Sequence, residues 1–270
     1  MISFPNAKIN LGLNIIEKRK DGFHNIASFF YPIKLADILE VIESGKFSFS
    51  SSGLTVPGEE SDNLVIKAYH LLKKDFNLPQ VSIHLHKSIP TGAGLGGGSS
   101  DGTFMLKILN ILFELYLDDS LLEEYAAQLG SDCPFFVQNK PMVAKGRGEE
   151  LDDFPLSLEG YFLFLVKPEQ AISTHEAYQL IMPRLPQVTI PDILTRESPE
   201  TWKELLKNDF EEAIFKKLPD YRNIKNKLYD QGAIYASMTG SGSAFFGIFK
   251  EKPDLKGQFP ASYFTWQEDL

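Results

Sequence analysis

The stretch Pro90-Thr91-Gly92-Ala93-Gly94-Leu95-Gly96-Gly97-Gly98-Ser99-Ser100 decides how this chain is interpreted. Residues 81–86 before it alternate apolar and polar and predict a strand, and residues 103–115 after it are apolar with helical spacing. Glycine lets a backbone approach a ligand closely, and the free N–H groups at the start of a helix attract anions. The order strand, glycine loop, helix therefore predicts a phosphate-binding loop rather than a flexible connection without a ligand.

Two known kinds of phosphate loop can be compared with this stretch. A Walker A loop has Lys and then Ser or Thr directly after the second glycine of G-x-x-x-x-G, whereas here residues 92–97 are followed by Gly98 and Ser99. The glycines at 92, 94 and 97 do satisfy the dinucleotide pattern G-x-G-x-x-G, and the acidic pair Asp118-Asp119 follows about 20 residues on. The Walker A interpretation is excluded, and an NAD(P)-binding oxidoreductase stays open as an alternative.

Composition limits the class of protein. The chain has 270 residues, 43% hydrophobic and 23% charged, which is typical of a globular protein. Its 27 basic and 36 acidic residues give a net charge of -9, so it lacks the basic surface that binds nucleic acid polymers. The single cysteine, Cys133, excludes an internal disulfide and favours a reducing compartment. No segment has the roughly 20 apolar residues that cross a bilayer, and the N-terminus shows no secretory signal pattern. We therefore expect a cytoplasmic protein with no membrane partner.

Strand-like and helix-like patterns are mixed along the chain, which predicts an α+β fold. The expected strands cover residues 9–15, 34–43, 47–50, 81–86, 161–166, 234–238 and 244–249. The expected helices are one capped by Asp62 that ends near Asn77, and others over residues 103–115, 121–129, 174–182 and 199–231, the last broken at Pro219. Gly, Asp and Pro accumulate between residues 146 and 155, so we expect a boundary there between a domain of residues 1–150 and one of residues 151–270.

The glycine loop resembles that of the GHMP kinases, the family named for galactokinase, homoserine, mevalonate and phosphomevalonate kinases. Four further segments resemble motifs of this family, in the same order: Ala7-Lys8-Ile9-Asn10-Leu11, Lys20-Asp21-Gly22-Phe23-His24, Gly130-Ser131-Asp132-Cys133-Pro134-Phe135-Phe136 and Met238-Thr239-Gly240-Ser241-Gly242-Ser243. The extra glycine before Ser99 resembles the branch whose acceptor is 4-diphosphocytidyl-2-C-methyl-D-erythritol. The resemblance implies a two-domain fold with the active site in the inter-domain cleft. It also implies ATP-dependent phosphorylation of the acceptor 2-hydroxyl in the non-mevalonate isoprenoid pathway.

The resemblance also implies the site residues. Lys8 and Asp132 match the catalytic pair, in which a carboxylate accepts the proton of the attacking alcohol and an ammonium favours the alkoxide. The positions that match the ATP site, which also requires Mg²⁺, are Asn63, Lys87, Pro90, Thr91, Gly92, Ala93, Gly94, Leu95, Gly96, Gly97, Gly98, Ser99 and Ser100. We name no protein ligand of the metal, although Ser99 and Ser100 are candidates. Without the resemblance, Lys8 reads equally well as a solvated lysine and Asp132 as a turn residue.

The acceptor carries a cytosine, which needs a flat apolar slot and hydrogen bonds on its edge. The positions that match this part of the family site are Phe23, His24 and Tyr178, with Asn10, Lys145 and Thr174 as candidates to contact the diphosphate and polyol. The family usually has Tyr where this chain has Phe23, so stacking survives but a hydroxyl contact is lost. Tyr178 also reads as ordinary helix packing.

Three other functions stay open beside this one. A GHMP kinase for homoserine or mevalonate would not need the rings at Phe23 and His24, because those acceptors carry no base. An NAD(P)-dependent oxidoreductase and a catalytically silent nucleotide-binding module are the other two. The sequence leaves the oligomeric state, monomer or homodimer, undecided.

Overall fold

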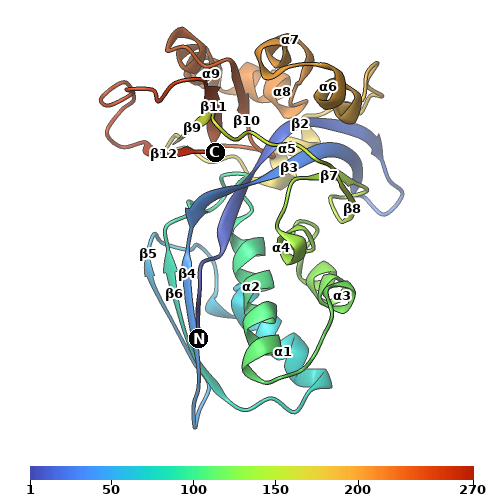
Figure 1. Ribbon diagram of the computed structural model, residues 1–270, viewed down its shortest axis with the longest axis vertical. Helices are drawn as coiled ribbons and strands as arrows, with labels where there is room; N and C mark the ends of the chain where they lie inside the picture. The colour runs from blue at the N-terminus through green and yellow to red at the C-terminus, as the bar shows by residue number, and fades with distance from the viewer. The chain divides into compact units, whose positions relative to one another are not determined.

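The computed structural model describes all 270 residues, which form two compact units (Figure 1). Unit 1 comprises Met1–Lys8, Pro32–Thr91 and Gly96–Lys140, and unit 2 comprises Ile9–Tyr31, Gly92–Leu95 and Pro141–Leu270. Within the glycine loop, this division assigns residues 90–91 and 96–100 to unit 1 and residues 92–95 to unit 2. The predicted boundary near residue 150 falls inside unit 2, so a division into residues 1–150 and 151–270 stays a prediction.

Unit 1 consists of one four-stranded sheet and four helices (Figure 1). The sheet has the strand order β1(Ile2–Ser3), β4(Ile38–Glu43), β6(Val81–Lys87), β5(Ser48–Gly53), with β6 antiparallel to β4 and parallel to β5. The helices are α1(Leu64–Asp75), α2(Gly97–Leu112), α3(Asp119–Leu129) and α4(Phe135–Gln138), and the short 3-10 helix η1(Glu60–Asp62) precedes α1. Burial alternates strictly along β6, and its inward side chains pack with α1 and α2 in one core.

Unit 2 contains two four-stranded sheets and the later helices. One sheet has the order β2(Asn6–Lys18), β3(His24–Ala36), β7(Met142–Lys145), β8(Glu150–Asp153), and the other β10(Tyr235–Met238), β11(Phe245–Phe249), β9(Phe162–Lys167), β12(Phe264–Asp269). The helices are α5(Thr174–Gln179), α6(Ile190–Arg196), η2(Pro199–Thr201), α7(Trp202–Leu205), α8(Phe210–Lys217) and α9(Pro219–Asp230). Apolar residues of β9 and β11 pack with α8 and α9 in the core of this unit.

Several predicted element boundaries are wrong. Asn63, and not Asp62, caps α1, because its Oδ1 accepts a hydrogen bond from the N–H of Val65 at 2.9 Å. Helix α2 begins at Gly97, inside the glycine loop, rather than at residue 103. Residues 34–43 form the end of β3 and all of β4, separated at Asp37. The predicted helix over residues 174–182 ends at Gln179.

The turn-rich stretch from residue 146 to residue 155 is mostly a hairpin. Strands β7 and β8 pair antiparallel on either side of the turn, with Lys145 opposite Glu150. Gly146 has a φ of 63°, a left-handed conformation that glycine adopts without strain. The accumulated Gly, Asp and Pro residues therefore indicate a turn correctly, and this turn belongs to a hairpin inside unit 2.

The topology does not favour the dinucleotide-binding alternative. In a Rossmann fold, the helix after the glycine loop leads to a parallel strand of the same sheet. Here the chain after α2 continues through α3 and α4 to β7, which belongs to a different sheet from β6. No helix of this chain combines the length and apolar character needed to cross a membrane.

Candidate active site

The glycine loop changes from turn to helix at Gly96. This residue is the N-cap of α2 and has a left-handed conformation, with φ 71° and ψ 12°. A Cβ at this position would lie 3.0 Å from Cζ of Phe136 and 3.2 Å from both Cγ and Cε of Lys8. Because residue 96 is glycine, the lysine side chain can pack directly against the start of α2. The free N–H groups and positive dipole end of this 16-residue helix suit an anion.

Lys8 and Asp132 form an ion pair in unit 1. Lys8 lies on β2 and Asp132 in the turn between α3 and α4, and Nζ is 3.3 Å from Oδ2. The lysine side chain is 3% exposed and the aspartate side chain 32% exposed. Lys8 is therefore a buried cation beside the helix start, and Asp132 presents a carboxylate that a bound alcohol can reach. This arrangement suits proton acceptance from a hydroxyl group.

The first turn of α2 contains a hydroxyl group that could be a ligand of the predicted magnesium ion. The hydroxyl of Ser100 is buried and has no hydrogen-bond partner in the structure. Mg²⁺ in phosphoryl-transfer sites usually takes most of its ligands from phosphates and water, with only one or two protein oxygens. None of the described residues form a group of three His, Cys, Asp or Glu side chains that could hold a metal ion. The donor set therefore fits a magnesium ion that arrives with ATP, with Ser99 and Ser100 as the candidates for its protein oxygens.

Cys133 follows Asp132 but takes no part in this chemistry. Its thiol is buried under α2, and the Thr103 hydroxyl donates a hydrogen bond to its carbonyl oxygen at 2.8 Å. Burial raises the pKa of the Cys133 thiol to about 12. The residue is a packing side chain, because a reactive cysteine needs a lowered pKa.

The two residues predicted beside the nucleotide, Asn63 and Lys87, both have structural partners. Asn63 caps α1, as described above, while Lys87 at the end of β6 is only 2% exposed. Its Nζ contacts the carboxylates of Asp37 and Asp101, the latter at 2.6 Å. The sequence analysis did not single out either aspartate. A direct contact between these predicted residues and ATP stays a prediction.

In unit 2, His24 and Tyr178 lie against each other. Their rings stack with centroids 4.8 Å apart and an interplanar angle of 23°, so no base fits between them as they stand. Tyr178 also packs edge-on against Phe210. Burial and the nearby charge of Lys18 lower the pKa of His24, which favours a neutral imidazole at pH 7. A neutral imidazole both donates and accepts a hydrogen bond, as reading a cytosine edge requires.

Phe23 remains open to solvent. It is 52% exposed, and the guanidinium of Arg147 lies 5.0 Å from its ring centroid. Arg147 was missed in the sequence analysis, because nothing in its local pattern ties it to Phe23. An exposed ring with a cation over one face leaves the other face available for stacking. A stacking contact of Phe23 with cytosine stays a prediction.

The three candidates for diphosphate and polyol contacts differ in accessibility. Asn10 is 1% exposed, its amide donates to Ser28 Oγ, and its Oδ1 accepts from the N–H of Gly240 at 2.9 Å. Thr174 begins α5 and is 3.1 Å from the Ser241 hydroxyl. Lys145 forms an exposed ion pair with Asp152. Thr174 and Lys145 are exposed, whereas Asn10 is buried and holds the backbone near Gly240.

The late glycine turn packs on the early glycine loop within unit 2. A Cβ on Gly94 would collide with the carbonyl oxygen of Thr239, and a Cβ on Gly240 would lie 2.9 Å from Cα of Gly94. The Thr239 hydroxyl is 3.2 Å from the carbonyl oxygen of Gly94, to which it donates a hydrogen bond. Asn208, also missed in the sequence analysis, donates to the carbonyl oxygens of Met238 and Gly240. The backbone approach that the glycines allow therefore joins residues far apart in the sequence.

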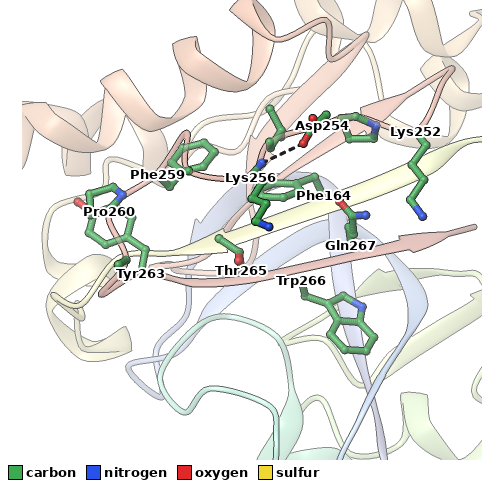
Figure 2. A pocket seen from close by; sticks show the side chains of 14 residues that line it. Phe164, Lys252, Asp254, Lys256, Phe259, Pro260, Tyr263, Thr265, Trp266 and Gln267 are labelled. Atoms are coloured by element: carbon green, nitrogen blue, oxygen red, sulfur yellow. Dashed lines mark hydrogen bonds between the residues drawn. The ribbon is translucent and has the colours of Figure 1, made fainter.

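A hollow elsewhere in unit 2 contains none of the predicted residues. It has a volume of about 700 Å³ and lies between β12 and the segment of residues 252–263 (Figure 2). Figure 2 shows the rings of Phe164, Phe259 and Tyr263 among the side chains that line it. We therefore do not assign this hollow to the chemistry of the glycine loop.

Comparisons with known proteins agree with this picture. The model described as GHMP kinases N terminal domain matches residues 63–140, and that described as GHMP kinases C terminal matches residues 190–258. Among curated relatives, a 4-diphosphocytidyl-2-C-methyl-D-erythritol kinase of Bacteroides fragilis (strain YCH46) is 51% identical over 275 aligned positions, covering 100% of both chains. A protein of the same name from Bacteroides thetaiotaomicron is 51% identical and covers 94% of both chains.

Solved structures show the same relationship. A crystal structure of 4-(cytidine 5'-diphospho)-2C-methyl-D-erythritol kinase superposes with a TM-score of 0.76 at 32% identity, covering 92% of this chain and 90% of that one. The Methanococcus jannaschii mevalonate kinase superposes with a TM-score of 0.72 at 14% identity, covering 100% and 98%, and shows a shared fold only. The predicted two-domain α+β GHMP kinase fold is confirmed. On its full-length relatives and its matches to both family domains, the chain belongs to the GHMP kinase family.

Proposed function

We propose that this GHMP kinase transfers the γ-phosphoryl group of ATP to the 2-hydroxyl of 4-diphosphocytidyl-2-C-methyl-D-erythritol. The products are the 2-phosphate and ADP, in the non-mevalonate route to isoprenoid precursors. The observation that carries the proposal is the ion pair of Lys8 and Asp132 beside the start of α2, in a chain whose full-length relatives bear this enzyme's name. The partner is thus a small molecule that carries a cytidine diphosphate group.

The chemistry follows from the positions of these groups. The N–H groups from Gly96 onward bind the phosphates of ATP, and Asp132 accepts the proton of the acceptor hydroxyl as its oxygen attacks the γ-phosphorus. The bond from the γ-phosphorus to the oxygen that bridges it to the β-phosphorus breaks, and ADP leaves. Lys8 stabilises the negative charge that develops on the attacking oxygen. A magnesium ion bound with ATP, with Ser99 and Ser100 as candidate protein ligands, would neutralise charge on the transferring phosphoryl group.

The acceptor distinguishes this proposal from kinases of the same fold. Homoserine and mevalonate carry no base, so neither would use the stacked rings of His24 and Tyr178 or the exposed ring of Phe23. The shared fold does not separate these acceptors, since mevalonate and homoserine kinases superpose on this chain at 13–14% identity. The aromatic residues and the full-length relatives together favour the cytidylyl acceptor. A cytoplasmic location and either a monomer or a homodimer stay predictions.

The decisive experiment offers the purified protein ATP together with each acceptor separately. We expect ADP release that depends on 4-diphosphocytidyl-2-C-methyl-D-erythritol, and phosphorus NMR that places the new phosphate on the 2-oxygen. ADP release with homoserine or mevalonate, and none with the cytidylyl compound, would reject the acceptor while leaving the kinase class intact. ATP that is not consumed with any of the three would favour the silent nucleotide-binding module.

A further inference from the structure

A buried cluster of three charged side chains lies at the base of the glycine loop in unit 1. Lys87 is the last residue of β6, Asp37 lies between β3 and β4, and Asp101 is the fifth residue of α2. Nζ of Lys87 contacts Oδ2 of both aspartates, and all three residues are at most 2% exposed. The reaction described above uses none of these side chains.

The cluster connects the two ends of the loop. Oδ1 of Asp37 accepts hydrogen bonds from the backbone N–H groups of Ser88 and Ile89, at 2.5 Å and 2.8 Å, just before the loop. Lys87 then joins Asp37 to Asp101, just after the loop. The residues between these anchors are the ones that bind phosphate in the proposed function. The ammonium group of Lys87 therefore links the two ends of the loop through Asp37 and Asp101.

We propose that Asp37, Lys87 and Asp101 are positioning residues that hold the glycine loop and the first turn of α2 in the conformation that binds the triphosphate. This inference rests on the proposed function for the identity of the ligand. It gives the Lys87 ammonium a role that needs no direct contact with the nucleotide, because that ammonium is held between two carboxylates.

Stability alone is a weak explanation for the cluster. Removing charges from water costs free energy, and apolar side chains of similar volume often give an equally stable core. A charged cluster differs from apolar packing because its hydrogen bonds fix directions and distances between particular atoms. The cluster has residues on both sides of the glycine loop, so its hydrogen bonds can fix the geometry of that loop.

The two aspartates play unequal parts. Asp37 uses both of its oxygens as acceptors, whereas Oδ1 of Asp101 is buried and has no hydrogen-bond partner. Burial raises the pKa of the Asp101 carboxyl well above its usual range, in spite of the opposing attraction of Lys87. Burial alone would lower the pKa of Lys87, but Asp101 and Asp37 together raise it. Lys87 therefore stays charged between the two buried carboxyl groups.

The different roles of the three side chains can be tested with single substitutions. Lys87→Met removes the ammonium and keeps the length of the side chain, while Asp101→Leu removes the carboxyl group. Asp101→Asn keeps the shape of the side chain and an oxygen that can accept the hydrogen bond from Lys87, so it should rescue what Asp101→Leu loses. The matched control is Lys67→Met, which breaks an exposed ion pair with Asp62 in the same unit.

Two readouts separate positioning from stability. The first is hydrogen exchange of residues 90–100 without nucleotide, where the N–H of Ser100 is normally bonded to the carbonyl oxygen of Gly96 at 2.9 Å. The second is the affinity for a non-hydrolysable ATP analogue, measured by calorimetry on variants whose thermal unfolding shows that they are folded. We expect faster exchange in this segment and about tenfold weaker binding, less than the roughly 100-fold cost of a 1 Å misplacement at a reacting centre.

The outcomes decide the proposal even if one variant fails to fold. Folded Lys87→Met with the exchange and affinity of the unmodified protein would overturn it. If Lys87→Met does not fold, equal behaviour of Asp101→Asn and Asp101→Leu would overturn it, and rescue by Asn alone would support it. Failure of the unmodified protein to bind the ATP analogue would instead contradict the proposed function, while the exchange measurement would still test the positioning.

Discussion

Replacing Asp132 by Asn tests the proposed chemistry most directly, because it keeps the shape of the side chain and removes its charge and basicity. At 3.3 Å, the attraction between Lys8 and Asp132 is about 5 kcal/mol for an effective dielectric constant of about 20. Asp132 is one-third exposed, so solvent screening reduces this figure. Loss of a general base costs about 100- to 10,000-fold in rate. We expect turnover to fall at least about 100-fold, equivalent to about 2.7 kcal/mol of transition-state stabilisation.

The assay must separate chemistry from binding. Turnover is measured at saturating ATP and acceptor, and the affinity for an ATP analogue is measured separately, because the loop amides that bind phosphate do not involve Asp132. We expect that affinity to stay largely unchanged. The matched control is Asp62→Asn, which removes an exposed carboxylate paired with Lys67 at 2.9 Å in the same unit. Turnover of Asp132→Asn close to that of this control would refute the assignment of Asp132 as the base.

Three further predictions test other parts of the molecule. His24→Ala removes the ring that stacks on Tyr178, so KM for the cytidylyl acceptor should rise about tenfold or more in steady-state kinetics; an equal loss of ATP affinity would contradict the assignment. Gly94→Ala places a side chain on a residue with a φ of 74°, where its Cβ would collide with the carbonyl oxygen of Thr239, so calorimetry should show weakened binding of an ATP analogue. Unchanged binding and an unchanged melting temperature would contradict the close packing. Cys133 has its pKa raised to about 12 by burial, so a thiol reagent at pH 8 should label it only after unfolding; fast labelling of the native protein would contradict its burial.

Elements with a clean local pattern could be predicted from the sequence. The alternation along β6 follows from one buried and one less buried face, and α3 has its apolar residues on one side. Strands β10 and β11 were also expected, because their apolar residues flank a glycine turn. In each case the side-chain pattern that determines burial lies within a few residues of sequence.

Other elements have no such pattern. Burial along β3 does not alternate regularly, because one part of the strand belongs to unit 2 and the other part to unit 1. Strand β12 is mostly exposed and polar at the edge of its sheet, so it lacks an apolar signal. The early start of α2 was missed because glycines oppose helix formation, although the anchored loop supports it here. Tertiary pairing determines these elements, and single-sequence patterns do not contain it.

Lys87 shows why a motif position does not define what a side chain does. The resemblance to the family places this residue next to the glycine loop, and its position at the end of β6 agrees with that. Its ammonium, however, is directed by Asp37 and Asp101, which lie on different elements and carry no pattern that links them in the sequence. A charge beside a phosphate loop can bind the phosphate or hold the loop, and its partners decide between the two. Because both partners here are buried carboxylates at the loop ends, the structure favours holding the loop, and Lys87→Met tests it.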